Sequence, residues 1–430
     1  MSTTAVSAEF RRKRSRVDPS SEQQFGGSSS SLPEEMIFEI LTRLPVKTLM
    51  RFKSVSKSWN SIITHSSFAD AHRSRSPSPN RAVVIMDPDP SLTFAGRESP
   101  SHFFYADLNK VYKKKGSSTV DVSLHLSVPE NLKYFGVTNT VNGLVCFYKR
   151  NVSKMLNIAT REIVDLPDSN YAYKHCVYHL GFDPADKSYK LLKICPVYED
   201  FDEDDDEEDD AEAFEEREIL PIRNMECEIL TLGKDNSWRI IPPPPCPIRR
   251  HCLCVKDGFL YWKFIFNLRI PKNSGIDRKR FFIAFNLATE RFQNLPNLSP
   301  KHLALNLPNF GTNLALVRQK SVFAYGRRRT EWLISSHFNQ ESGLWSKINR
   351  YMLPFDHDCR IGILPEGKVL MYSSFPRMMF LIDDHKKKKG ERVAVEKIFI
   401  NHVGGIRIGL CRLCLYEENL ISLKHLINNM

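Results

Sequence analysis

Apolar residues recur at helical spacing in a short stretch, residues 31–73, near the N-terminus. These apolar residues fall into three groups, and each group lies on one face of a predicted short helix. Pro45 ends the first of the three helices. Their apolar members are Ile37, Ile40, Leu41 and Leu44, then Leu49 and Phe52, then Val55, Trp59, Ile62 and Ile63. Three short helices bury little surface by themselves, and Val46 and Met50 fall outside the core-facing stripe. The pattern therefore predicts a helical module that completes its apolar core against a partner.

The pattern changes at about residue 81. From there to residue 425, short runs rich in β-branched and aromatic residues alternate with Gly, Pro, Asn and Asp, without helical stretches between them. The runs are Ala82–Met86, Leu144–Tyr148, Tyr189–Ile194, Cys227–Leu232, Phe259–Trp262, Phe281–Phe285, Asn313–Val317, Trp332–Ser335 and Leu413–Tyr416. They predict a large all-β domain, which could be a sandwich, a barrel or a propeller.

A repeated segment favours the propeller. Asn157–Pro167 and Asn286–Pro296 agree at five of eleven positions without a gap, and both read as a strand, a tight turn at Ala-Thr and a returning strand. Corresponding positions in similar predicted hairpins are Val111, Ile163, Trp238, Phe292, Trp345 and Val395. Apart from one longer step, their spacing is roughly 50 residues, the period of kelch-like blades. We expect an α+β multidomain protein: a three-helix module followed by a kelch-like β-propeller of about six blades.

Composition indicates the borders between these parts. Residues 1–30 are rich in Ser, Gln and Gly, which predicts a disordered tail, and residues 74–80 read as a linker to a β-domain at 81–425. Residues 199–218 hold 15 acidic side chains and one Arg, and they fall within the one longer step of the repeat. Such a segment cannot pack, so we expect a solvated insertion between two strands.

Charge is distributed unevenly along the chain. The net charge is +11 although residues 199–218 are strongly acidic, so the remaining residues carry a large positive surplus. Basic runs fall mostly between apolar segments, where solvated turns are expected, although a surface for polyanions is the alternative. The runs are Arg11–Arg14, Lys113–Lys115, Arg278–Arg280, Arg327–Arg329 and Lys386–Lys389. Nucleic-acid binding is therefore the less favoured interpretation.

The chain shows no signal for a membrane or for secretion. It contains no run of eighteen apolar residues, and its N-terminus is polar and then basic. We expect a cytoplasmic or nuclear protein, with the cluster Arg11, Arg12, Lys13 and Arg14 as a candidate import signal. In those compartments the ten cysteines would be mostly reduced.

Motifs for catalysis or metal binding are missing from the sequence. No phosphate-binding, dinucleotide-binding, nucleophile-elbow or zinc-protease motif occurs. Cys411-x-x-Cys414 has no second pair at zinc-like spacing, and His251-Cys252-x-Cys254 begins a predicted strand. We therefore expect no catalytic site, no metal and no cofactor.

The helical stretch resembles the F-box motif. The matching residues are Leu32–Glu35, Ile37, Ile40-Leu41, Arg43–Lys47, Leu49, Phe52-Lys53, Val55, Lys57-x-Trp59 and Ile62. The resemblance implies docking on the Skp-type linker subunit of a cullin–RING ubiquitin ligase. Carried over by motif, the docking residues are Leu32, Pro33, Ile40, Leu41, Leu44, Pro45, Leu49, Phe52, Val55 and Trp59. Trp59 is the expected anchor, and Pro33 and Pro45 are expected to be exposed.

Residues 81–425 resemble the plant F-box-associated domain. Its marks are Asn142–Cys146, Asn157-x-Ala-Thr-Arg161, Leu166-Pro167, Gly181–Pro184, Tyr189–Leu192, Leu230–Gly233, Trp238-Arg239, Gly258-x-Leu260-Tyr261-Trp262, Phe285–Leu287 and Glu290–Phe292. Asn286 stands where the family usually has aspartate, and the long acidic insertion is also unusual. The resemblance implies a domain that holds a target protein for ubiquitination. The other interpretations are a kelch-like carbohydrate binder or enzyme and a nucleic-acid-binding protein; the sequence does not name the target.

Overall fold

The structure is a computed structural model that describes a helical stretch and much of the β-domain. The described ranges are 32–75, 82–88, 100–114, 117–132, 135–173, 176–198, 222–245, 254–256, 258–264, 281–294, 310–311, 316–324, 327–335, 338–339, 344–345, 349–353, 359–363, 369–373, 378–383, 394–401, 412–416 and 418–427. The predicted tail, the basic cluster in it, the acidic insertion and most of the predicted linker lie outside these ranges.

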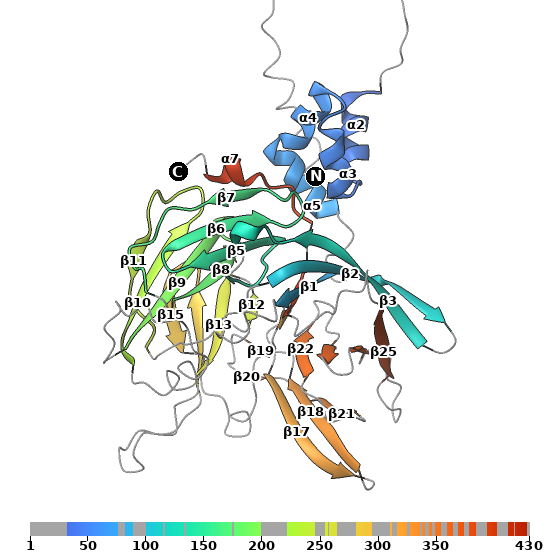
Figure 1. Ribbon diagram of the computed structural model, residues 1–430, viewed down its shortest axis with the longest axis vertical. Helices are drawn as coiled ribbons and strands as arrows, with labels where there is room; N and C mark the ends of the chain where they lie inside the picture. Colours follow the sequence, from blue (N-terminus) through green and yellow to red (C-terminus); the bar gives the residue numbers. More distant parts are fainter. Residues whose placement is uncertain are drawn as a thin grey trace, which may run out of the picture.

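Four short helices form the N-terminal module at one end of the molecule (Figure 1). They are α2 (Glu34–Leu41), α3 (Val46–Phe52), α4 (Lys57–Thr64) and α5 (Ser66–Arg75). The first three confirm the predicted helices. Pro33 and Pro45 sit at the N-cap positions of α2 and α3, where a missing amide hydrogen costs nothing. Ser56 caps α4 by accepting a hydrogen bond from the Trp59 amide at 3.0 Å.

The fourth helix, α5, was not predicted, because its sequence carries no apolar stripe. Several of its side chains hold it in place, among them Arg75, which donates to Thr42 Oγ1 at 2.7 Å and to Glu39 Oε1 at 2.5 Å. Phe68 is fully buried and meets the Phe38 ring edge-on at 5.3 Å between centroids. His72 is 3% exposed, and its Nε2 donates to the Leu44 carbonyl at 2.9 Å. Tertiary contacts made by Phe68, His72 and Arg75 outweigh the weak helical pattern.

Three four-stranded antiparallel sheets follow one another along the chain and are drawn in green to yellow in Figure 1. The first contains β4 (Gly136–Val137), β5 (Leu144–Lys149), β6 (Val152–Asn157) and β7 (Ile163–Asp165). The second contains β8 (Val177–Asp183), β9 (Ser188–Tyr198), β10 (Ile222–Thr231) and β11 (Arg239–Ile241). The third contains β12 (Cys254–Lys256), β13 (Phe259–Phe264), β14 (Phe281–Asn286) and β15 (Arg291–Asn294).

The remaining described strands form sheets of other sizes. A nine-stranded sheet has the order β16-β22-β23-β24-β25-β3-β2-β1-β26. Its members are β1 (Ala82–Pro88), β2 (Pro100–Lys114), β3 (Ser117–Ser127), β16 (Phe310–Gly311), β22 (Cys359–Ile363), β23 (Val369–Ser373), β24 (Met378–Asp383), β25 (Ala394–Asn401) and β26 (Arg412–Leu415). The smaller sheets are β17 (Leu316–Ala324) with β18 (Arg327–Ser335) and β21 (Asn349–Leu353), and β19 (Phe338–Asn339) with β20 (Leu344–Trp345).

The all-β domain of several antiparallel sheets confirms the coarse prediction. Three regular four-stranded units agree with blades, whereas the number of blades and the closure of a ring stay predictions. Two details were wrong. Val111 lies inside the continuous strand β2 and does not follow a turn. Of the basic runs expected in turns, Arg327–Arg329 begin strand β18, and Lys113 and Lys114 end strand β2.

Consecutive sheets share apolar cores. Side chains of the first and second sheets, among them Leu144, Tyr178 and Leu191, form one core, and the second and third sheets form another around Ile229 and Phe285. A third core joins the first sheet to β2 and to the residue after β26. A Cβ at Gly181 would lie 2.5 Å from Leu287 Cδ1, so the second and third sheets meet at close range. Packing of neighbouring sheets face to face, rather than any single sheet, therefore makes the core.

Candidate partner-binding surfaces

The helical module has a closed internal core. Its buried members are Leu41, Val46, Leu49, Ile62, Ile63, Phe68 and Leu420, the last contributed by the far end of the chain. Leu41 and Leu49, two of the ten predicted docking residues, are 1% and 0% exposed and offer no surface to a partner in this arrangement. Val46 was predicted to lie outside the core and is 1% exposed, because the turn before α3 points it inward.

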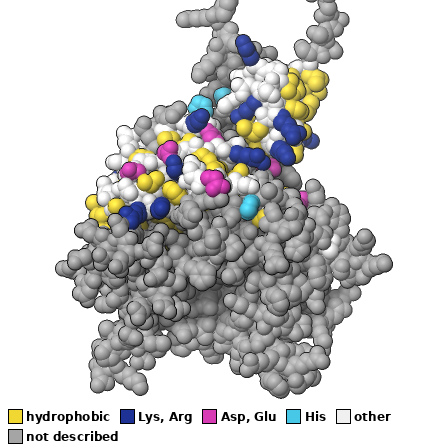
Figure 2. All heavy atoms as spheres, in the orientation of Figure 1, with side chains coloured by type: hydrophobic (Ala, Val, Ile, Leu, Met, Phe, Trp, Pro, Cys, Tyr) yellow, Lys and Arg dark blue, Asp and Glu magenta, His cyan; other side chains and the backbone are white. Residues whose placement is uncertain are grey.

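Apolar side chains are nevertheless left on the surface of this module. Leu32, Ile40 and Val55 are 52%, 49% and 62% exposed, and Met36, which the motif did not single out, is 51% exposed. Leu32, Met36 and Ile40 are four residues apart and so follow one side of α2 and its entry. Figure 2 shows hydrophobic side chains gathered along one side of the module, with Lys and Arg beside them. The module thus presents an apolar strip although its core is already filled.

The other predicted docking residues lie between these extremes. Pro33 and Pro45 are exposed, as expected from their place before each helix. Leu44, Phe52 and Trp59 are half-buried. The Phe52 and Trp59 rings lie 5.0 Å apart between centroids, so the proposed Trp anchor is braced by a neighbouring aromatic ring. No contact with a partner tests these residues, so their role in docking stays a prediction.

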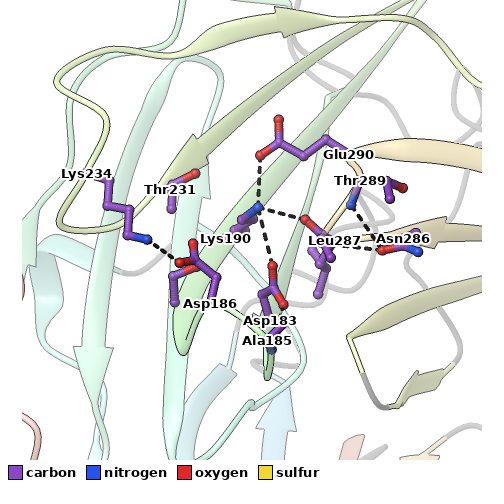
Figure 3. Close-up of polar contacts among 12 residues, drawn as sticks. Asp183, Ala185, Asp186, Lys190, Thr231, Lys234, Asn286, Leu287, Thr289 and Glu290 are labelled. Atoms are coloured by element: carbon purple, nitrogen blue, oxygen red, sulfur yellow. Dashed lines mark hydrogen bonds and ion pairs between the residues drawn. The ribbon is translucent and has the colours of Figure 1, made fainter.

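An ion-pair network joins the second and third sheets of the β-domain at their turns (Figure 3). Lys190, 5% exposed, donates from Nζ to the Leu287 carbonyl at 2.7 Å and to Glu290 Oε1 at 2.9 Å, and its Nζ lies 3.6 Å from Asp183 Oδ2. Arg239 donates to both Glu290 oxygens at 2.8 and 2.9 Å. These hydrogen bonds from Arg239 lower the pKa of Glu290, with a smaller contribution from Lys190. Lys190, Arg239 and Glu290 are each paired with an opposite charge. The network therefore stabilises the contact between the second and third sheets.

A second buried lysine holds the crossover from the first sheet to the second. Lys193 is 0% exposed and donates to Ser169 Oγ at 2.5 Å and to the Tyr171 carbonyl. Its Nζ lies 5.4 Å from the centre of the Tyr178 ring. Burial lowers the pKa of Lys193 to about 8, and the nearby carboxylate of Glu228 opposes that shift. Sequence patterning missed this lysine because a lysine within a strand is expected to point to solvent, and nothing close in sequence shows that Ser169 and Tyr171 cover it.

Cysteine chemistry departs from expectation at one pair. Cys176 and Cys195 form a disulfide, although the cysteines were expected to be mostly reduced. Cys146 and Cys227 are buried free thiols, and burial raises the pKa of both. Among the described residues, no three His, Cys, Asp or Glu side chains gather in a way that could hold a metal ion. In the same ranges, none of the helices has the length and apolar character needed to cross a bilayer.

A small helical module with an apolar strip, followed by a large β-domain of stacked sheets, is the layout of an F-box protein. The F-box domain family matches residues 29–70, and the F-box associated beta propeller domain family matches residues 91–405. The chain therefore belongs to the family of F-box proteins with an F-box associated beta propeller domain. F-box proteins are typically non-catalytic adaptor subunits of Skp–cullin–F-box ubiquitin ligases, and the F-box implies a Skp-type partner.

Similar proteins come from the plant Arabidopsis thaliana. A putative F-box protein is 29% identical over 347 residues, which cover 77% of this chain and 74% of that protein. Another F-box protein is 27% identical over 399 residues, covering 86% of this chain and 87% of the relative. An F-box/kelch-repeat protein is 32% identical over 225 residues, covering 50% and 47%. The chain is thus a plant F-box protein.

Proposed function

We propose that this chain is the substrate-recruiting subunit of a Skp–cullin–F-box ubiquitin ligase. The helical module docks on the Skp-type linker, and the β-domain holds a target protein. The adaptor itself performs no chemistry. It raises the effective concentration of the target's lysines near a conjugating enzyme brought by the cullin and RING subunits. We place the protein in the cytoplasm, the nucleus or both.

The observation that supports docking is the exposed strip Leu32, Met36 and Ile40 along α2 and its entry, together with exposed Val55 in the turn between α3 and α4, on a module whose internal core is complete. Apolar side chains of this size, grouped on one side of a helix, are stabilised by burial against a partner. The half-buried Leu44, Phe52 and Trp59 continue the same contact surface. Leu41 and Leu49 support the surface from within and are not proposed to touch the linker.

The experiment that tests docking compares two isoleucines changed in the same way. Ile40→Asp places a charge within the strip, whereas Ile240→Asp places one on strand β11, where Ile240 is 68% exposed. Both sites are exposed, so neither change should alter the melting temperature much. We expect Ile40→Asp to weaken binding of the full chain to a purified Skp-type linker by about 30-fold or more, since hot-spot losses exceed ~2 kcal/mol. Ile240→Asp should bind as the unmodified chain does.

Equal binding by the Ile40→Asp variant and the unmodified chain, measured by calorimetry, would remove the docking surface from the proposal. If the unmodified chain fails to bind any Skp-type linker, the adaptor function itself is wrong. The target is sought by affinity purification with the Ile40→Asp variant, which should retain target that the ligase no longer consumes.

A further inference from the structure

The last strand of the β-domain, β26, ends beside the start of its first strand, β1. Strand β26 pairs antiparallel with β1, with Leu415 opposite Val83 and Arg412 opposite Met86. The C-terminal end of β26 therefore lies next to the N-terminal end of β1, which follows the helical module. We call residues Glu418–Ile427, which continue from this point and include α7 (Leu423–Ile427), the C-terminal strap. Figure 1 shows α7 lying over β7, to one side of the helices.

The first four residues of the strap contact the helical module and the β-domain in alternation. Glu418 and Leu420 contact the helical module, whereas Asn419 and Ile421 contact the β-domain. Neighbouring side chains from Glu418 to Ile421 therefore face opposite parts of the molecule, although these residues pair with no strand. This alternation makes it a two-sided interface segment.

The contacts to the helical module supply the N-terminal cap that α3 does not have in its own sequence. Pro45 precedes α3 and gives no side-chain cap, and the Val46 amide donates instead to Glu418 Oε2 at 2.8 Å. A carboxylate there also suits the positive end of the helix dipole. Leu420 is 7% exposed and belongs to the module's core beside Leu49. The F-box core is therefore completed by a residue more than 300 positions away in the sequence.

The contacts to the β-domain are buried hydrogen bonds. Asn419 is 6% exposed; its Nδ2 donates to the Asn142 carbonyl at 2.8 Å and to the Tyr189 hydroxyl at 3.3 Å. Asn157, 0% exposed, donates from Nδ2 to the carbonyls of Asn419 and Ile421 at 2.9 and 3.0 Å. Buried groups of this kind are costly to leave unpaired, so the strap is held firmly on this side.

Helix α7 anchors the end of the strap. Glu162 of the β6–β7 turn accepts from the Leu423 and Lys424 amides at 2.8 and 3.0 Å. Leu423 is fully buried in the core between the first and second sheets. Gly233 has a φ of +79°, and a Cβ there would lie 2.5 Å from the Leu426 carbonyl oxygen, so α7 sits directly on the β10–β11 turn.

We propose that the C-terminal strap fixes the orientation of the helical module on the β-domain and so sets the angle at which a bound target faces the linker and the rest of the ligase. Glu418 and Leu420 act as positioning residues on one side, and Asn419 on the other. The part concerning target presentation rests on the proposed adaptor function. The part concerning orientation does not, because the contacts that support it lie within this chain.

The test separates folding of the module from its placement. Probes are attached through unnatural amino acids at two exposed positions, Ser58 on α4 and Gln293 on β15. The distance distribution between them is measured by electron paramagnetic resonance in the full chain. The variant Glu418→Ala/Leu420→Ala should lose the single narrow distance peak, and hydrogen exchange at the Val46 amide should accelerate about tenfold. Neither change touches Leu32, Met36 or Ile40, so binding of the Skp-type linker should stay within about twofold of the unmodified value at a temperature at which circular dichroism shows the helices folded.

Two further variants sharpen the result. Glu418→Gln alone keeps an acceptor for the Val46 amide and should retain the narrow peak. Lys424→Ala changes an exposed strap residue on α7 and should leave every readout unchanged.

A narrow peak in the Glu418→Ala/Leu420→Ala variant would overturn the proposal. Loss of linker binding in that variant would also overturn it, because the strap would then be needed to fold the module and not to orient it. Failure of the unmodified chain to bind the linker would instead overturn the adaptor function, and the distance measurement would still decide the role of the strap.

Discussion

The two copies of the repeat make the same turn. In each copy an asparagine ends a strand, and its side-chain oxygen accepts from the two following Ala and Thr amides. The distances are 3.0 and 3.3 Å for Asn157 and 2.9 and 3.2 Å for Asn286. The fourth residue after the asparagine is left-handed in both, with φ of +63° at Arg161 and +55° at Glu290. The Asn-x-Ala-Thr pattern thus specifies the turn by local hydrogen bonds.

The two turns differ in what they hold. The order Arg161-Glu162 in the first copy becomes Glu290-Arg291 in the second. Glu162 accepts from the backbone amides of α7, whereas Glu290, one position earlier, pairs with Lys190 and Arg239 of the preceding sheet. A one-residue difference in the position of the carboxylate therefore changes its partner. Glu290 joins the second and third sheets, whereas Glu162 binds the C-terminal strap. The comparison teaches that the shared positions encode the turn, while the charged pair that follows selects its neighbour.

The largest difference in stability between the two copies is expected when each asparagine is changed to alanine. Asn157→Ala leaves the carbonyls of Asn419 and Ile421 without their donor in a buried site, so we expect a loss of about 2–4 kcal/mol in the free energy of unfolding. Asn286→Ala removes only the turn's own hydrogen bonds, which are more exposed, and should cost about 0.5–1 kcal/mol. Urea denaturation of the two variants measures both values. Equal losses would show that Asn157 does not hold the strap.

A smaller difference is expected at the carboxylates. Glu290→Gln should cost about 1 kcal/mol at neutral pH, since its partner Arg239 is partly exposed and the ion pair is weakened by solvent. Because the pKa of Glu290 is lowered in the folded state, its stabilisation is complete above the usual value of 4.5 and is lost as pH falls through the lower folded value.

The stability difference between the unmodified chain and Glu290→Gln should therefore shrink below about pH 4.5 in urea titrations. Glu162→Gln is the counterpart in the first copy: it replaces one of the two oxygens that accept from the Leu423 and Lys424 amides by an NH2 group, so it tests the hold on α7 and not the contact between sheets. A difference for Glu290→Gln that stays constant down to about pH 3 would show that its charge contributes nothing to the contact between sheets.

The smallest effect is expected from Asn286→Asp, which introduces the residue that the family usually has. Its carboxylate keeps the two hydrogen bonds to the turn, so we expect a change of less than about 0.5 kcal/mol in thermal or urea unfolding. Asn157→Asp is the counterpart: it removes the donor and places a negative charge against two carbonyls. Equal tolerance of aspartate at both positions would contradict the division of roles between the two copies.

Local pattern was enough for some of the fold. The i, i+3, i+4, i+7 series placed α2, the Ala-Thr turns placed two hairpins, and alternating runs placed β5, β9, β10, β13 and β14. These features depend on contacts between residues close in sequence, which a pattern records directly. For the candidate docking surface, the residues carried over by motif include the exposed Leu32, Ile40 and Val55, and the motif could not separate them from Leu41 and Leu49, which lie on the inner side.

The sequence by itself determined the F-box, the all-β domain and the turn in each repeat copy. Only the tertiary structure decided that Leu420 completes the helical core, that Phe68 and His72 support a fourth helix, and that Lys190 and Lys193 are buried in polar networks. Each of these depends on a partner far away in the chain. A side chain's burial is set by what packs over it in three dimensions, and neighbours along the sequence carry no record of that partner.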